Sequence, residues 1–340
     1  MSARAASVRT YFVRILDGMA RGLFASLIIG LIITQLGELL GLNWLIELGD
    51  IAQYMMGPAI GIGVAASVSA SGLSLYAAAV TGAIGAGTVT FTGGVVEVAI
   101  GEPVGALVAA LIGAEVARRI SGKTPVDIVL VPAAAILTGG GAGLLMAPVL
   151  IEMTYFLGGM INAATMLRPF PMGVLVSAIM GMLLTLPISS AALAISLGLE
   201  GLAAGAATVG CSAQMIGFAV TGFKTNGPGG FFAQALGTSM LQIGNIVKNP
   251  YIWVPPTLTA AVLGPVATVI FEMSNSRIGA GMGTSGLVGQ VATLDVMGSG
   301  ALPGIIILHF ILPAVLSYIV FAVMKTRGLI KDSDLNIQEG

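Results

Sequence analysis

Charged side chains are scarce in this sequence. The 340 residues include 14 Lys and Arg and 15 Asp and Glu. Only 9% of the chain is therefore charged, whereas soluble domains carry about 25%. Such a chain cannot cover a water-facing surface with charge, which indicates that the lipid bilayer is its solvent. The net charge of −1 gives no argument for a nucleic-acid partner, and we expect none.

Cysteine and histidine each occur once. The single Cys211 excludes a disulfide framework and a cysteine-based metal site, and its apolar surroundings predict a packing role. His309 also lies in an apolar run, where a packing role is favoured over proton transfer. The sequence lacks a Walker loop and any Ser–His–Asp set. We therefore expect no catalytic residues, no metal and no cofactor on this chain.

Long apolar runs, in contrast, fill most of the sequence, which is 56% hydrophobic with a mean hydropathy of +1.00. A helix needs about 20 apolar residues to cross the hydrocarbon layer, and Lys and Arg in short loops stay cytoplasmic. These two rules predict an all-α polytopic protein of a bacterial inner membrane, with both termini cytoplasmic. The ten expected crossings are residues 22–42, 50–70, 73–92, 102–118, 126–148, 150–166, 169–199, 201–223, 252–273 and 303–324.

The same pattern divides the chain into four parts. Residues 1–21 carry Arg4, Arg9, Arg14 and Arg21 and are expected to form a cytoplasmic or interfacial lead-in helix. Residues 22–168 form an N-terminal membrane half and residues 169–325 a C-terminal half. Residues 326–340 form a cytoplasmic tail.

One polar stretch does not fit a crossing helix. The sequence "TNGPGGFFAQALGTSMLQIGNIVKNPYIWVPP", residues 225–256, combines glycines with several amide side chains. Lys224 and Lys248 bracket its first part. If both stay cytoplasmic, residues 226–247 must enter and leave the membrane on the same side. This predicts a re-entrant hairpin near residues 226–248, whose backbone must be buried in protein or line a wet cavity.

A second glycine-rich, polar stretch, residues 275–300, carries Arg277, Gln290 and Asp295. We expect a hairpin near residues 276–300 that enters from the outside. Opposed half-membrane segments recur in transporters, where they place free backbone groups near the midplane. A hydroxyl-rich or anionic solute could bind there.

The candidate substrate-binding residues are polar or charged side chains in or beside these hairpins. Amides and hydroxyls would donate and accept hydrogen bonds, while Lys248 and Arg277 would steer an anionic group. The candidates are Asn226, Gln234, Gln242, Asn245, Lys248, Asn249, Glu272, Asn275, Arg277, Thr284, Ser285 and Gln290.

Some candidates have a second interpretation. Lys248 can simply mark the cytoplasmic exit, Glu272 can form an interfacial ion pair with Arg277, and Asp295 fits a capping or loop role. The run "GAGMGTSG", residues 279–286, fits either ligand contact or close helix packing.

The stretches "GTSMLQIGNIVKNPYIWVPP" (237–256) and "GAGMGTSGLVGQ" (279–290) resemble a known family. They are similar to the membrane-embedded EIIC components of the phosphoenolpyruvate-dependent sugar phosphotransferase system. Within these, they resemble the compact branch that includes perfringolysin-regulator-type membrane proteins. The resemblance implies re-entrant hairpins in a C-terminal transport half that binds sugar, a homodimer built on the N-terminal half, and separate EIIB and EIIA partner proteins.

Three functions are compatible with these observations. The first is an EIIC-like transporter of a small polar solute, such as a sugar or sugar derivative, that works by alternating access. The second keeps the fold but makes the protein a membrane-bound regulator or sensor. The third is an ion-coupled transporter that is independent of phosphotransfer.

Overall fold

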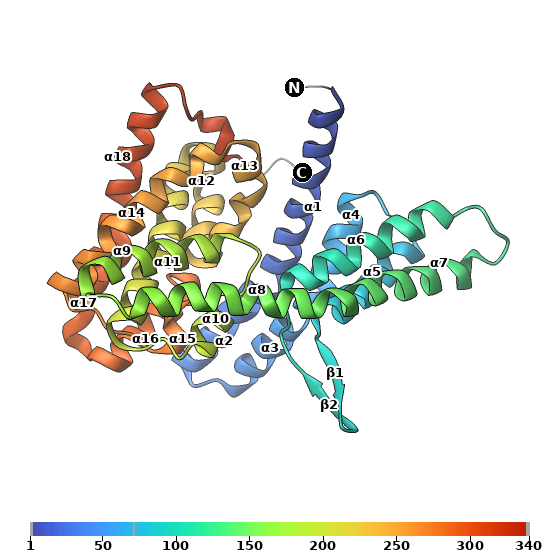
Figure 1. Cartoon of the computed structure of the whole chain (residues 1–340), viewed down its shortest axis with the longest axis horizontal. Helices are drawn as coiled ribbons and strands as arrows, with labels where there is room; N and C mark the ends of the chain where they lie inside the picture. The colour runs from blue at the N-terminus through green and yellow to red at the C-terminus, as the bar shows by residue number, and fades with distance from the viewer. Residues whose placement is uncertain (1–2, 71, 338–340) are drawn as a thin grey trace. The chain divides into compact units, whose positions relative to one another are not determined.

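A computed structural model describes residues 3–70 and 72–337, which are almost entirely helical (Figure 1). The chain divides into two compact units, with the boundary between Met153 and Thr154. This boundary lies inside one continuous helix, which therefore contributes residues to both units.

The first unit contains eight helices or parts of helices and a two-stranded sheet within the described residues. In chain order they are α1 (Ala3–Leu23), α2 (Ile29–Leu40), α3 (Asn43–Tyr54), α4 (Met56–Ser67), α5 (Leu73–Ala86), β1 (Val89–Thr92), β2 (Val95–Val98), α6 (Pro103–Ile120), α7 (Asp127–Ala135) and the start of α8 (Gly141–Thr165), with π-helical turns at Phe24–Ile28 and Ile136–Gly140.

The second unit begins within α8 and is built around α11. Its helices are α9 (Pro169–Thr185), α10 (Ser190–Ser196), α11 (Gly201–Thr221), α12 (Phe223–Phe232), α13 (Ile243–Lys248), α14 (Val254–Pro265), α15 (Arg277–Ala280), α16 (Val288–Met297), α17 (Leu302–Ile305) and α18 (Leu312–Thr326). Short π-helical or 3-10 turns lie at Ala233–Gly237, Ser239–Gln242, Pro250–Trp253, Val266–Ile270, Ser285–Leu287, Ser299–Ala301, Ile306–Ile311 and Asp332–Leu335.

Five helical runs among the described residues are long and apolar enough to cross a membrane. They are Val8–Leu40, Asp127–Thr165, Gly201–Thr221, Pro250–Ile270 and Ser299–Thr326. Shorter apolar helices cover Met56–Ser67, Leu73–Ala86 and Pro169–Thr185. The last three long runs overlap the expected crossings at 201–223, 252–273 and 303–324.

The expected break between crossings 126–148 and 150–166 is wrong, because one helical run of 39 residues covers Asp127–Thr165. Pro148 lies inside α8, and Pro132 lies inside α7. A proline inside a helix lacks a backbone donor and frees the carbonyl four residues earlier, which membrane helices tolerate where neighbouring groups satisfy that carbonyl. A π-helical turn at Ile136–Gly140 begins four residues after Pro132.

The expected crossing at 73–92 is also too long. Helix α5 ends at Ala86 because Gly87 adopts a left-handed conformation (φ 69°), a common helix C-cap. Strands β1 and β2 then form an antiparallel hairpin that pairs Val89 with Val98. Gly93 and Gly94 both have positive φ at its turn, which a two-residue hairpin loop requires.

Two further boundaries differ from the expected ones. The lead-in segment is not separate from the first crossing, because α1 continues through the turn Phe24–Ile28 into α2. The crossing at 50–70 is divided, because Met55 leaves helical geometry between α3 and α4.

In the second unit, α11 packs closely against α9 and α14. A Cβ atom added to Gly210 of α11 would lie 1.9 Å from the backbone oxygen of Ser177 on α9. Small residues permit this backbone approach, which drives helix association in lipid. Helix α11 is thereby almost wholly covered by the rest of its unit.

Candidate functional site

Helix α11 provides a measure of depth for the second unit. Its 21 residues span about 31 Å at 1.5 Å per residue, which matches the thickness of the hydrocarbon layer. Cys211 lies at its midpoint, with ten residues on either side. Contacts to the two ends and to the middle of α11 therefore show where a neighbouring segment lies along this axis.

Residues 223–249, here called the first hairpin, leave from the C-terminal end of α11. Helix α12 and the turn Ala233–Gly237 run to Thr238, whose extended conformation (φ −158°, ψ 145°) breaks the helix. The turn Ser239–Gln242 and α13 then return. Both ends of the segment meet residues 329–334: Lys224 forms an ion pair with Asp332, and Asn249 donates to Asp334. The segment therefore starts and finishes at the same end of the unit.

Residues 275–297, the second hairpin, start from the opposite end of α11. Asn275 and Gly201 exchange two backbone hydrogen bonds of 3.0 and 3.2 Å at the first residue of α11. Helix α15 leads to a turn at residues 281–284, and α16 returns. The Ser274 amide donates to Met297 Sδ over 3.1 Å, so the two ends of this segment also lie together.

The tips of the two hairpins meet beside the middle of α11. Ser285 Oγ donates to the carbonyl of Gly237 at 2.8 Å, and Thr284 Oγ1 donates to the carbonyl of Ala235. Gly283 has a positive φ of 55°, and an added Cβ atom would lie 2.7 Å from Cys211 Cβ. The second tip is therefore pressed against the midpoint of α11.

Buried hydroxyls and one amide surround this meeting point. Thr185 Oγ1 lies 2.8 Å from Ser239 Oγ and 3.3 Å from Gln214 Oε1. Gln214 Nε2 donates to Thr257 Oγ1 at 2.9 Å. These side chains come from α9, α11, α14 and the first hairpin, so the polar cluster links four elements.

Gln290 and His309 form a second buried pair one turn beyond the second tip. Gln290 Nε2 and His309 Nδ1 are 3.0 Å apart. Among the described residues, Gln290 Oε1 and His309 Nε2 are buried without a hydrogen-bond partner, an arrangement that costs free energy unless a ligand or water completes it. His309 also lies in the π-helical turn Ile306–Ile311, a feature often found at functional sites.

The predicted amides of the first hairpin are brought together, and they bind the end of the described chain rather than one another alone. Gln242 donates to Gln234 Oε1 and Asn245 donates to Gln242 Oε1, both at 2.8 Å. The tail segment, residues 328–337, lies along this row. It accepts hydrogen bonds at its backbone carbonyls from Asn226, Gln242, Asn245 and Asn249, over 2.8, 3.0, 2.8 and 3.1 Å respectively.

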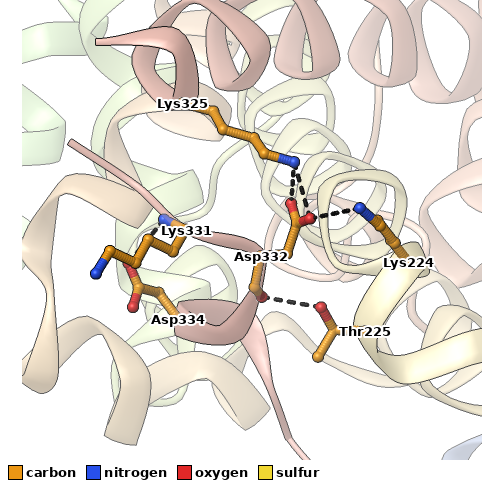
Figure 2. A network of polar contacts seen from close by, with 6 residues as sticks. All are labelled: Lys224, Thr225, Lys325, Lys331, Asp332 and Asp334. Atoms are coloured by element: carbon orange, nitrogen blue, oxygen red, sulfur yellow. Dashed lines mark hydrogen bonds and ion pairs between the residues drawn. The ribbon is translucent and has the colours of Figure 1, made fainter. Parts of the chain in front are cut away.

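Asp332 ties the tail segment to two lysines, as Figure 2 shows. Its carboxylate lies 2.9 Å from Lys224 Nζ and 2.6 Å from Lys325 Nζ. The hydrogen bonds from Lys325 and Lys224 hold the pKa of Asp332 below its ordinary value. Thr225 Oγ1 also donates to the Asp332 carbonyl at 2.9 Å. This contact set joins the first turn of α12, the end of α18 and the tail segment.

The remaining candidates occupy different surroundings. Asn275 is buried and donates to Thr208 Oγ1, Thr293 Oγ1 and the Gly289 carbonyl, so it holds the second hairpin to α11. Lys248, Glu272 and Arg277 are exposed. The expected ion pair between Glu272 and Arg277 is wrong for the described structure, where no such contact exists, because the extended residues 273–276 separate the two side chains.

Several contacting residues were missed from the sequence. Gln214 is the one amide within the uncharged stretch 201–223, and that isolation is a signal that could have identified it. Thr185, Thr208, Ser239 and Thr293 have no such signal, because hydroxyls in apolar helices commonly bond their own backbone. Within residues 3–70 and 72–337, no group of three or more His, Cys, Asp or Glu side chains is placed to hold a metal ion.

Comparison with known proteins adds one finding. A family model described as "Phosphotransferase system, EIIC" matches residues 13–337, which is nearly the whole chain. No curated protein and no solved structure matched the chain.

Proposed function

The chain belongs to the phosphotransferase system EIIC family, and from this premise we propose that it carries a small, neutral, hydroxyl-rich solute across the membrane. A sugar or sugar derivative fits this description. As a member of the family it is a membrane transporter subunit of the phosphotransferase type, and EIIC components work with EIIA and EIIB partners. The solute, its path and the transport cycle are the proposal.

One observation carries the proposal: a buried donor on His309 and a buried acceptor on Gln290, which lies in the helix that follows the second tip, have no hydrogen-bond partner. With Gln290 Nε2 donating to His309 Nδ1, the neutral imidazole has its proton on Nε2. The pair then offers an N–H donor on His309 and an acceptor oxygen on Gln290. A solute hydroxyl both donates and accepts, so it complements this pair.

The charge distribution favours a neutral solute over an anionic one. The buried polar groups around the tips are amides, hydroxyls and one imidazole. Lys248 and Arg277, the cations expected to steer an anionic group, are exposed. An uncompensated anion among such groups would be costly in lipid surroundings.

The proposed topology follows from the contacts of α11. Both hairpins enter the membrane as re-entrant segments, the first from the cytoplasmic side and the second from the outside, and the chain crosses several times with both termini cytoplasmic. Alternating access would expose the tip region to either side in turn. The first unit would serve as the scaffold of a homodimer, as in the expectation from the sequence.

The test is solute binding and uptake by reconstituted protein. Replacing Gln290 with Leu removes the acceptor, and we expect at least a tenfold loss of affinity for the transported sugar, about 1.4 kcal/mol. Gln53→Leu is the matched control, since Gln53 is a buried glutamine of the first unit, bonded to Thr34. Unchanged binding by the folded Gln290→Leu protein would remove the site assignment. Uptake that persists without phosphoenolpyruvate but needs an ion gradient would favour an ion-coupled carrier instead.

A membrane-bound sensor is the second candidate, and the tail segment favours it. The amide row of the first hairpin contacts residues 328–337 directly, so a change at the tips could be passed to a cytoplasmic segment. The perfringolysin-regulator-type branch noted in the sequence would fit this role. Altered gene expression with normal uptake in a deletion strain would support the sensor, and lost uptake would support the transporter.

A further inference from the structure

The tail segment contacts the first hairpin in the way that a bound peptide contacts a protein. Four carboxamides, those of Asn226, Gln242, Asn245 and Asn249, donate to its main-chain carbonyls. The Ile337 amide returns a hydrogen bond of 2.9 Å to Asn226 Oδ1. Hydrogen bonds to a peptide's main chain give affinity and pockets for its side chains give specificity, which is a recurring division in peptide recognition.

Two apolar side chains and one carboxylate give this contact its specificity. Ile330 and Leu335 are each 1% exposed and pack into a cluster with Phe218, Ile246 and Phe321. Asp332 lies between them in the chain and pairs with Lys224 and Lys325 (Figure 2). The surface thus recognises an acidic residue flanked by two buried apolar ones.

We propose that the amide row of the first hairpin is a peptide-binding surface whose resident ligand is the chain's own tail segment, residues 328–337. While the tail segment is bound, it fastens the base of the first hairpin to the end of α18. The base of that hairpin moves away from α18 only when the tail segment leaves. Release of the tail segment therefore controls whether the first hairpin can move independently of α18.

This arrangement also changes what the predicted site residues do. The side-chain amides of four of them donate to the tail segment and are not available to a solute in this state: Asn226, Gln242, Asn245 and Asn249. The tip groups described above remain. The peptide-binding surface lies on the first hairpin, whereas the proposed solute site lies at Gln290 of the second hairpin and at His309. The first does not depend on the second.

A matched pair of variants in the tail segment tests the proposal without altering the hairpin. Leu335→Asp places a charge at a side chain that is 1% exposed, whereas Leu329→Asp makes the same change at one that is 38% exposed. Hydrogen–deuterium exchange of residues 239–249 should be at least about tenfold faster in Leu335→Asp, because local opening sets the exchange rate. It should be unchanged in Leu329→Asp, and α11 should stay protected in both.

Adding the ligand back separates a binding surface from a simple loss of stability. A synthetic peptide of residues 328–337, GLIKDSDLNI, should restore protection of residues 239–249 in the Leu335→Asp protein. The same peptide carrying the Leu335→Asp change should not. Unchanged exchange in Leu335→Asp, or protection that neither peptide restores, would overturn the proposal. These measurements need no solute, so they stand whether or not transport is observed.

Discussion

The first and second hairpins differ in the groups that accept hydrogen bonds from their buried side-chain amides. In the first hairpin, Gln242 and Asn245 donate to a segment about 90 residues further along the chain. In the second, Asn275 donates to Thr208 on α11 and to its own hairpin. The second hairpin is therefore part of the packed core, while the first is held by the ten residues of the tail segment. Two polar, glycine-rich segments can thus have similar compositions and different hydrogen-bond partners.

The largest effect on stability should come from crowding the tip of the second hairpin. Gly283→Ala requires a left-handed residue, at roughly 1–2 kcal/mol, and places a methyl group 2.7 Å from Cys211 Cβ, with overpacking adding typically 1–3 kcal/mol. We expect a total loss of about 3 kcal/mol in thermal unfolding. Gly328→Ala is the control, because Gly328 also has positive φ (72°) but open space around it. Equal losses in the two variants would contradict close packing at the tip.

Removing one asparagine from each hairpin should separate the two further. A buried side-chain hydrogen bond in a membrane protein contributes roughly 0.6 kcal/mol. Asn275→Ala loses three such bonds, for about 2 kcal/mol, and Asn245→Ala loses two, for about 1 kcal/mol. A double-mutant cycle with Leu335→Asp should show coupling for Asn245 and none for Asn275. Coupling to Asn275 would mean that the tail segment stabilises both hairpins.

The smallest effect concerns pH. The pKa of Asp332 is lowered by Lys325 and Lys224, so its contribution is present above the unfolded value of about 3.9 and is lost as the pH falls through the folded value. Protection of residues 239–249 should therefore stay constant between about pH 8 and pH 5. Lys331 and Asp334 also lie near this contact. A release midpoint near pH 6 in hydrogen exchange would show that another group governs the tail segment.

The family and the membrane class could be predicted from the sequence, and both are confirmed by the family match. The polar stretches were visible because glycines and amides are conspicuous among apolar runs. Their bracketing lysines suggested that the first stretch folds back, and the contacts of Lys224 and Asn249 with one short segment agree with that expectation. Insertion of either hairpin into a membrane stays a prediction.

The binding of the tail segment could not be predicted. Its hydrogen bonds from the amide row go to backbone carbonyls, which every residue carries. Its side-chain anchors Ile330, Asp332 and Leu335 are residue types that are common in polar tails, so the sequence does not indicate where the segment binds. The long run Asp127–Thr165 was divided because its 39 residues exceed the about 20 that one crossing needs, whereas the helix continues through Pro148 in the structure. The residues of β1, 89–92, were included in the expected crossing at 73–92 because they continue an apolar run. Hydropathy reports how apolar a stretch is. It does not distinguish a strand from a helix, or one long helix from two shorter ones.

The midpoint of α11 has one further consequence. Cys211 is the sole thiol of the chain and is completely covered, with the Gly283 turn lying against it. Its sulfur lies against the carbonyls of Met180 and Ala280, so a thiol reagent reaches it only when the packing around the middle of α11 opens. The rate at which a thiol reagent alkylates Cys211 therefore reports how often the core around the middle of α11 opens. Comparing this rate with and without solute requires no engineered label.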